Sequence, residues 1–206
     1  MRWYAYCKYL TFDIWKIKLN LTSDEPLIER GYMLANHRTF ADFAIDPFLA
    51  DSAIVGRRLA FFAVFWPTML GYPEQRIFSF VRGKETRSAL FQRIKKHFAL
   101  RNRILFFPEG TRLKYTHLSS KDDVKTYLKY GLLKEIYLDK THPVQIQISS
   151  NKELVFNEKK FHIQYGVPVR THRTKAIYPT NYATEAEFYD AIASEWYNAW
   201  LKTHTE

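Results

Sequence analysis

The sequence predicts an α/β domain in which helices flank a mixed, mostly parallel sheet, preceded by an N-terminal amphipathic helix. Three observations support this fold class. Segments with strand patterns alternate with helical segments along most of the chain. The 206 residues, 47% of them hydrophobic, are enough for one domain with a sizeable core. No internal repeat and no linker rich in glycine, proline or serine divides the chain.

The N-terminal helix is expected over residues 1–21, where apolar residues recur at alternating steps of four and three. Aromatic residues on its other sides leave the helix apolar nearly all round, so it packs on the core or lies at a membrane interface. Its Tyr, Trp and Lys side chains, apolar with polar tips, slightly favour the interface. Because residues 23–26 break the pattern, we divide the chain into a membrane-interface helix (1–22) and the main domain (23–206).

Apolar segments bounded by turn residues predict the strands. The first segment leads directly into Asn36 and His37, and the third stops at Pro108. The fourth alternates apolar residues with Gln145 and Gln147, which is typical of a strand with one buried face. The expected strands are residues 31–35, 77–81, 103–107 and 144–148, with one or two more between 161 and 169.

Three later segments predict helices. Residues 86–100 place apolar side chains at steps of four beneath a basic outer face. Residues 121–138 also have a helical pattern, although Gly131 weakens the prediction. The final helix is the clearest, because Thr184 and Glu187 form a capping box. That box precedes a single apolar face made by Phe188, Ile192, Trp196 and Trp200.

The positive charge of the chain is concentrated in one stretch. The sequence has 31 basic and 21 acidic residues, a formal net charge of +10. Residues 57–114 hold 13 of the basic residues and only 3 of the acidic ones, so the rest of the chain is neutral. Such a cluster is either the solvated face of a helix or an anion-binding site. A basic chain rich in aromatic residues suits nucleic acid, a phosphorylated cofactor or an anionic membrane.

Several classes of protein are excluded or disfavoured. The single cysteine, Cys7, excludes an internal disulfide framework and a cysteine-rich zinc module, and no set of histidines is spaced as a metal site. The longest apolar run, residues 59–70, is too short to span a membrane and contains Pro67. No secretory signal peptide is visible. We therefore expect an intracellular protein that associates peripherally with membranes.

The first group of residues with chemical potential is Asn36-His-Arg-Thr-Phe-Ala-Asp42, directly after a predicted strand. On a continuous helix His37 and Asp42 would be about 140° apart, so they meet only if His37 lies on the turn before a helix. Asp42 would then fix the imidazole tautomer and leave the other nitrogen free to take a proton from a substrate hydroxyl. Alternatively, with Thr39 as helix cap, Asp42 has the spacing of a purely structural capping residue.

The second group is Phe107-Pro-Glu-Gly-Thr-Arg112, at the end of another predicted strand. Pro108 ends the strand and Gly110 permits a close approach of the backbone to a ligand. Glu109, Thr111 and Arg112 follow at a strand end, where α/β sheets commonly bind ligands. An arginine there can hold a phosphate through two hydrogen bonds, although a turn with incidental charges has the same pattern.

These two groups together resemble the glycerophospholipid acyltransferase family, which includes 1-acylglycerol-3-phosphate acyltransferases. The resemblance covers residues 30–150, and His-x4-Asp and Phe-Pro-Glu-Gly-Thr-Arg occur in the family's order. The intermediate arginine motif of the family is matched by Arg82. The last motif, a proline beside a β-branched residue, is matched by Pro143 and Val144, with Pro168-Val169 as a rival match.

The resemblance implies transfer of an acyl group from acyl-CoA, or acyl carrier protein, to the free hydroxyl of a lysophospholipid. The expected acceptor is 1-acylglycerol-3-phosphate, with glycerol-3-phosphate or another lysophospholipid as alternatives. His37 would be the general base and Asp42 its orienting partner, with no metal and no cofactor beyond the acyl donor. The substrate-binding residues would be Arg82, Glu109, Gly110, Thr111, Arg112, Pro143 and Val144.

The resemblance also implies how the protein meets its lipid. Residues 59–70 and the N-terminal helix would contact an anionic bilayer, and no nucleic acid partner is expected. Arg38-Thr39 stands where the family most often has Gln-Ser, and the spanning helices of many relatives have no counterpart in this sequence. A second hypothesis is a non-catalytic basic protein that binds nucleic acid or a membrane surface. Paired aromatics such as Phe61-Phe62 suit a core or lipid better than stacking on bases.

Overall fold

The computed structural model describes residues 2–58, 71, 74–81, 83, 86–98, 103–112, 117–158 and 160–205. Within this part of the chain a seven-stranded sheet has the order β1-β9-β6-β2-β5-β3-β4. Neighbouring strands are parallel except for the antiparallel pair β6 and β9, which confirms the predicted mixed, mostly parallel sheet. The strands are β1 (Lys18–Ser23), β2 (Gly31–Ala35), β3 (Ala53–Arg57), β4 (Ile77–Phe80), β5 (Arg103–Phe106), β6 (Val144–Ser149) and β9 (Pro168–Arg173).

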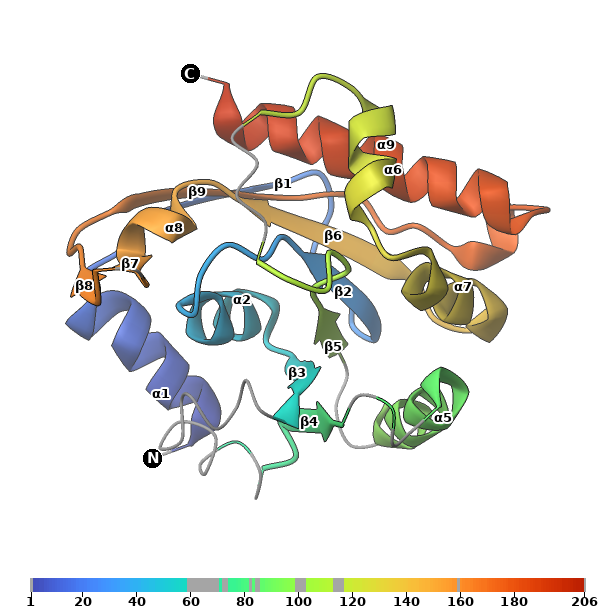
Figure 1. Ribbon diagram of the computed structural model, residues 1–206, viewed down its shortest axis with the longest axis horizontal. Helices are drawn as coiled ribbons and strands as arrows, with labels where there is room; N and C mark the ends of the chain where they lie inside the picture. Colours follow the sequence, from blue (N-terminus) through green and yellow to red (C-terminus); the bar gives the residue numbers. More distant parts are fainter. Residues whose placement is uncertain are drawn as a thin grey trace.

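Helices cover both faces of this sheet (Figure 1). One face is covered by α5 (Arg87–His97), α7 (Tyr130–Asp139) and α9 (Glu185–His204), with α6 (Lys121–Tyr127) packed on α9. The other face is covered by α1 (Trp3–Tyr9) and α2 (Asp42–Ala50). Short elements complete the described chain: a π-helical turn (Leu10–Ile14), α8 (Lys152–Val155), the hairpin β7 (Phe156–Asn157) and β8 (His162–Ile163), and a 3-10 turn (Pro179–Asn181).

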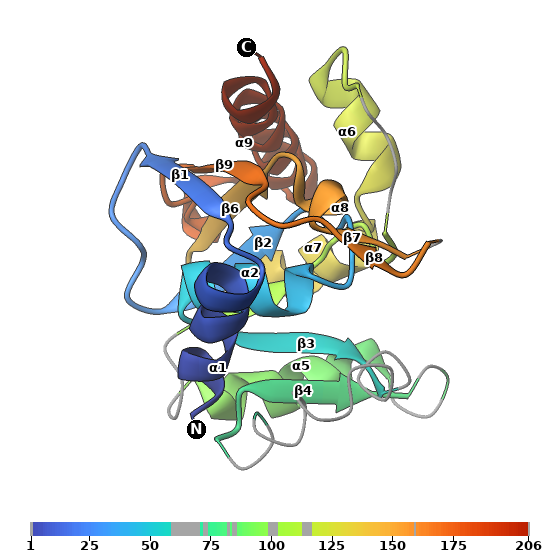
Figure 2. The ribbon, with the colours of Figure 1, turned by 90° about the vertical axis from the view of Figure 1, so that its left-hand side faces the viewer.

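The core follows the alternation of side chains along the central strands. In β2, Tyr32 and Leu34 pack in the cluster that includes α5, α7 and α9, whereas Met33 and Ala35 pack in the cluster that includes α1 and α2. Because both faces are covered, all five residues of β2 are buried, which explains the continuous apolar run in the sequence. Figure 2 shows β3 and β4 side by side with their arrowheads pointing the same way.

The N-terminal segment differs from the predicted helix over residues 1–22. The helix ends early, Lys16 has a positive φ of 54°, and residues 18–23 form β1, which pairs in parallel with β9. Trp3 and Cys7 are buried against the core and do not face solvent. Ile17 and Leu21 fit the helical spacing, but together with Leu19 they also fit a period of two, and pairing with β9 selects the strand. The sheet therefore begins inside the segment that we set apart.

Two other predictions need correction. The helix expected over 121–138 is two helices, broken at Leu128 and Lys129, where the backbone N–H of Lys129 donates to Pro108 O at 2.8 Å. β6 is buried along its whole length and not on one face alone, and the buried Gln145 amide donates to Pro26 O and Thr174 O. We did not predict β3, whereas the strands near 31, 77 and 103 and the last helix are confirmed.

Candidate active site

His37 and Asp42 meet in the turn between β2 and α2. Nδ1 of His37 lies 2.9 Å from Oδ2 of Asp42. The same oxygen accepts the backbone N–H groups of Arg38 and, at 3.0 Å, of Thr39. Asp42 therefore both shapes the turn and holds the imidazole. The Thr39 side chain does not cap α2, because its hydroxyl donates to the carbonyl of Phe156.

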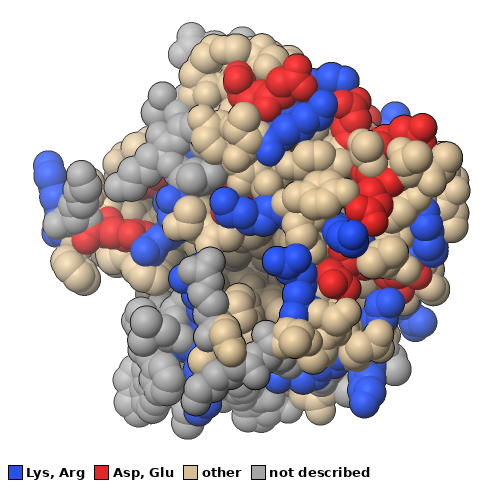
Figure 3. Space-filling model, turned by 45° about the vertical axis from the view of Figure 1, so that its right-hand side comes forward, with Lys and Arg blue, Asp and Glu red and all other residues tan. Residues whose placement is uncertain are grey.

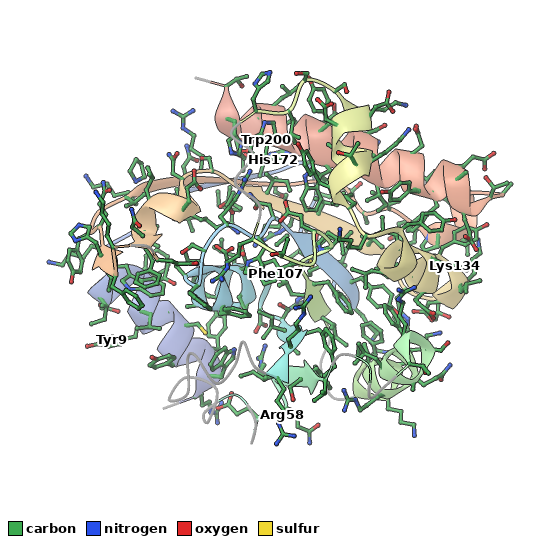
Figure 4. The ribbon with its side chains drawn as sticks, in the orientation of Figure 1. Tyr9, Arg58, Phe107, Lys134, His172 and Trp200 are labelled. Carbon is green, nitrogen blue, oxygen red and sulfur yellow. The ribbon has the colours of Figure 1, made fainter. Side chains whose placement is uncertain are left out.

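The imidazole of His37 is held between aromatic rings. It stacks on Phe107 at 4.3 Å between ring centroids, and its centroid lies 5.7 Å from that of Phe43 in an edge contact. Figure 4 places Phe107 near the centre of the molecule. The carboxylate of Asp42 accepts the proton on Nδ1, so Nε2 carries the lone pair. Nε2 makes no hydrogen bond to the described part of the chain.

His37 lines a cavity of about 670 Å³ at the carboxyl ends of β3, β4 and β5. Its described lining includes many apolar side chains: Phe40, Phe43, Val55, Phe80, Leu90, Phe91, Phe106, Phe107 and Leu132. It also includes four cationic residues, Arg57, Arg87, Arg112 and Lys129, and no described lining residue is acidic. Figure 3 shows Lys and Arg side chains around a hollow in the molecular surface. The cavity thus combines an apolar wall with a positive charge, as an anionic amphiphile requires.

The segment 107–112 supports the site in two ways. Glu109 is fully buried, and its Oε2 accepts the backbone N–H of His37 at 2.6 Å. Gly110 has a φ of +71°, and a Cβ there would lie 3.3 Å from Cγ of Lys129, so both backbone and space favour glycine. Nη1 of Arg112 lies 2.7 Å from Glu158, and its guanidinium lies over the ring of Phe40. Glu109 thus holds the histidine, while the following residues face the cavity.

A buried ionic cluster behind the imidazole was not expected from the sequence. Lys152, Asp42 and Asp46 all have completely buried side chains. Nζ of Lys152 lies 2.6 Å from Asp46 and 3.5 Å from Asp42. The spacing of four residues, which places Asp42 and Asp46 on one face of α2, was the available signal. No pattern in the sequence indicated their partner Lys152, which is 106 residues away from Asp46 along the chain.

The cluster shifts the pKa values of its members. Burial raises the pKa of Asp42, but Lys152 and then His37 outweigh it and leave that pKa below its usual value. Burial raises the pKa of Asp46 to about 7, although Lys152 opposes the shift. Burial lowers the pKa of Lys152, but Asp42 and Asp46 outweigh it and hold the pKa above its usual value. Asp42 and Lys152 are therefore charged at neutral pH.

The structure brings together only some of the residues expected to bind substrate. Gly110, Thr111 and Arg112 line the cavity with His37, and Glu109 lies behind it. Arg82 and residues 59–70 lie outside the described residues. The two expected residues at the start of β6 do not line the cavity, because their end of the sheet is opposite to His37. They are Pro143 and Val144, and the rival pair, Pro168 and Val169, is also absent from the cavity lining.

Register explains the distance of Val144 from the site. Val144 pairs with Tyr32, three residues or about 10 Å before β2 ends at Ala35. His37 follows the end of that strand, so the two residues lie toward opposite ends of neighbouring strands. The sequence pattern placed both on strands but carried no information on which strand ends share an edge.

Among the comparisons with known proteins, the one with solved structures agrees with this fold. No family model matches the sequence, and no curated protein matches it. Among solved structures, the chain is similar to the 1-acyl-sn-glycerophosphate (LPA) acyltransferase PlsC from Thermotoga maritima, with a TM-score of 0.65. The sequences are 17% identical, and the match covers 96% of this chain and 77% of that one. The protein therefore has the fold of that acyltransferase over nearly its whole length.

Proposed function

We propose that this protein is an acyltransferase of the glycerophospholipid family, which transfers a fatty acyl group from acyl-CoA or acyl carrier protein to a lysophospholipid hydroxyl. The observation that carries the proposal is the His37–Asp42 pair on the wall of a cationic and apolar cavity. The fold shared with a solved LPA acyltransferase supports it. The acceptor that we propose is 1-acylglycerol-3-phosphate, which would give phosphatidic acid.

In the proposed mechanism, Nε2 of His37 takes the proton from the acceptor hydroxyl while that oxygen attacks the thioester carbonyl. The new C–O bond forms and the C–S bond then breaks, and the thiolate leaves with the proton that His37 has taken. Asp42 accepts a hydrogen bond from Nδ1 and stabilises the imidazolium formed during the step. General base catalysis of this kind contributes about 10²- to 10⁴-fold in rate.

The cavity lining fits the parts of such substrates. Arg112, Arg87, Arg57 and Lys129 provide charges for the phosphate of the acceptor or of CoA. The aromatic wall provides an apolar surface for an acyl chain. No helix in the described part of the chain is long and apolar enough to cross a membrane. We propose that the protein obtains its lipid by peripheral association with an anionic membrane.

The test is thiol release from a long-chain acyl-CoA when 1-acylglycerol-3-phosphate is added in detergent or vesicles. Wild type is compared with His37→Ala, Asp42→Asn and, as a control, His117→Ala at an exposed histidine. We expect acceptor-dependent release in wild type and in the control, at least 10²-fold less in His37→Ala, and a loss in Asp42→Asn. Persistent release in His37→Ala would contradict the mechanism.

The choice of acceptor is tested in the same assay with glycerol-3-phosphate and other lysophospholipids in place of 1-acylglycerol-3-phosphate. Faster release with one of them changes the acceptor and leaves the reaction class standing. Absence of thiol release with every acceptor would contradict the proposed enzymatic activity and favour a non-catalytic protein that binds a membrane or nucleic acid.

A further inference from the structure

The ammonium group of Lys152 lies on the opposite side of Asp42 from the imidazole. Oδ2 of Asp42 contacts His37, whereas Oδ1 lies 3.5 Å from Nζ of Lys152 and has no hydrogen-bond partner among the described residues. The ammonium group is held by Asp46 and by the carbonyl of Asn36, each at 2.6 Å. Asn36 in turn accepts the backbone N–H of Ser149 and donates to its carbonyl. The lysine therefore links α2, the turn before His37 and β6.

A buried cluster of this kind is costly unless each charge has a partner. Asp42 and Lys152 are both charged at neutral pH, whereas Asp46, with a pKa of about 7, adds its negative charge to the cluster as the pH rises through neutrality. Protonation of His37 places a positive charge beside the ionised carboxylate of Asp42, whose Oδ2 lies 2.9 Å from Nδ1. The cluster therefore favours the imidazolium that a general base becomes during proton transfer, without exposing a carboxylate to the cavity.

We propose that Lys152 and Asp46 are positioning residues for the His37–Asp42 pair: Lys152 keeps Asp42 ionised and in place, and Asp46 holds Lys152. Neither side chain lines the cavity, so both act through Asp42. The inference rests on the proposed function for its kinetic test alone. A measurement of the charge and the tautomer of His37 tests the inference without any substrate.

Other charged groups surround the cluster and stay in every variant. Glu109 accepts the backbone N–H of His37, and Arg112 lies with His37 on the cavity wall. Arg38 and His204 both lie against the ring of Trp200. Arg173 donates to Gln147, which also donates to Asp46. Because these groups are the same in every variant, a change in the pH dependence of the Lys152 and Asp46 variants reports the loss of those two charges.

The experiment compares the pH dependence of kcat/KM in wild type, Lys152→Met and Asp46→Asn. Removal of a buried positive charge raises the proton affinity of its neighbours. We therefore expect Lys152→Met to shift the acidic limb of the kcat/KM profile to higher pH by about one unit or more. Asp46→Asn removes a negative charge and leaves the limb in place or moves it to lower pH. A purely structural role lowers the rate in both variants without moving the limb, and that result would overturn the inference.

The second measurement is ¹⁵N NMR of the His37 imidazole over the same pH range. In wild type we expect the proton on Nδ1, and in Lys152→Met a His37–Asp42 titration midpoint raised by about one unit or more. Lys160→Met, at an exposed lysine, is the matched control and keeps the wild-type midpoint. An unchanged midpoint in Lys152→Met would overturn the inference even if the enzyme were active.

A third variant keeps the test valid if Lys152→Met does not fold. Lys152→Met with Asp46→Asn removes both charges of the pair, which avoids leaving one ion buried alone. Its His37 midpoint stays above that of wild type, because Asp42 still lacks its cation. A wild-type midpoint in this folded double variant refutes the positioning role. If wild type transfers no acyl group to any acceptor, the proposed function fails, while the NMR titrations still decide the inference.

Discussion

At the scale of single residues, the carboxylates of Glu109 and Asp42 both accept hydrogen bonds from backbone N–H groups near the imidazole. Glu109 accepts the N–H of His37, and Asp42 accepts those of Arg38 and Thr39. We expected Glu109 to bind the acceptor, but its complete burial suits a role in fixing the His37 main chain. For Asp42, a single oxygen contacts the imidazole and accepts backbone N–H groups of the turn, although Thr39 does not cap α2 as the structural interpretation required.

Gly131 offers a test that separates stability from binding. A Cβ at this position would lie 2.0 Å from Nη1 of Arg87, so Gly131→Ala displaces a guanidinium that lines the cavity. The long arginine side chain moves at little cost, and alanine reduces the entropy of the unfolded chain. We therefore expect the free energy of unfolding to rise by about 0.4–1 kcal/mol in a urea titration. We also expect KM for a phosphate-bearing acceptor to rise several-fold.

Arg87→Met is the direct comparison, and Lys96→Met, at an exposed residue on the same helix, is the control. Arg87→Met should raise KM as Gly131→Ala does, and Lys96→Met should not. If KM stays at the wild-type value in both Gly131→Ala and Arg87→Met, Arg87 takes no part in binding the acceptor.

At the scale of elements, α1 illustrates how packing decides between two environments. Its sequence suits a membrane interface, but Trp3 and Cys7 are buried with residues of β2 and α2. An exposed side of the helix remains, including Tyr4 and Tyr9. The helix can therefore present aromatic rings to a bilayer while its other side stays in the core.

Cys7 reports the state of α1. Burial raises the pKa of its thiol well above the usual range, and the side chain has no solvent exposure. We expect a thiol reagent to label Cys7 at neutral pH only after denaturation, and anionic vesicles to leave the native protein unlabelled. Labelling is followed by mass spectrometry, with denatured protein as the positive control. Fast labelling in the presence of vesicles would show that α1 leaves the core at the membrane.

At the scale of the whole molecule, the net charge of +10 makes salt dependence informative. Binding to nucleic acid releases counterions and falls by orders of magnitude between about 50 and 200 mM salt. Insertion of apolar side chains into a bilayer depends less on salt. We therefore expect cosedimentation with vesicles containing an anionic lipid to survive at 200 mM salt, with neutral vesicles as the control. Tight binding to nucleic acid, with loss of vesicle binding at this salt concentration, would support the non-catalytic alternative.

Local patterns in the sequence determined much of this molecule. The capping box at Thr184 and Glu187, the apolar run of β2 and the strand ends at His37 and Pro108 are each encoded within a few residues. The pairing of His37 with Asp42 follows in the same way, because the two partners are only five positions apart in one turn. These features depend on backbone geometry and short-range hydrogen bonds, which adjacent residues supply.

Only the tertiary structure decided the rest. Ile17 and Leu21 fit a helical spacing and, with Leu19, a period of two, and pairing of residues 18–23 with β9, about 150 residues later, selects the strand. Glu109 reaches the main chain of His37, and Lys152 reaches Asp46, across separations that no local pattern encodes. Val144 lies away from the cavity because the register with β2 places it beside Tyr32, toward the strand ends opposite to His37. Long-range contacts of this kind depend on how strands and helices are stacked, and a burial pattern along one segment does not specify its partner.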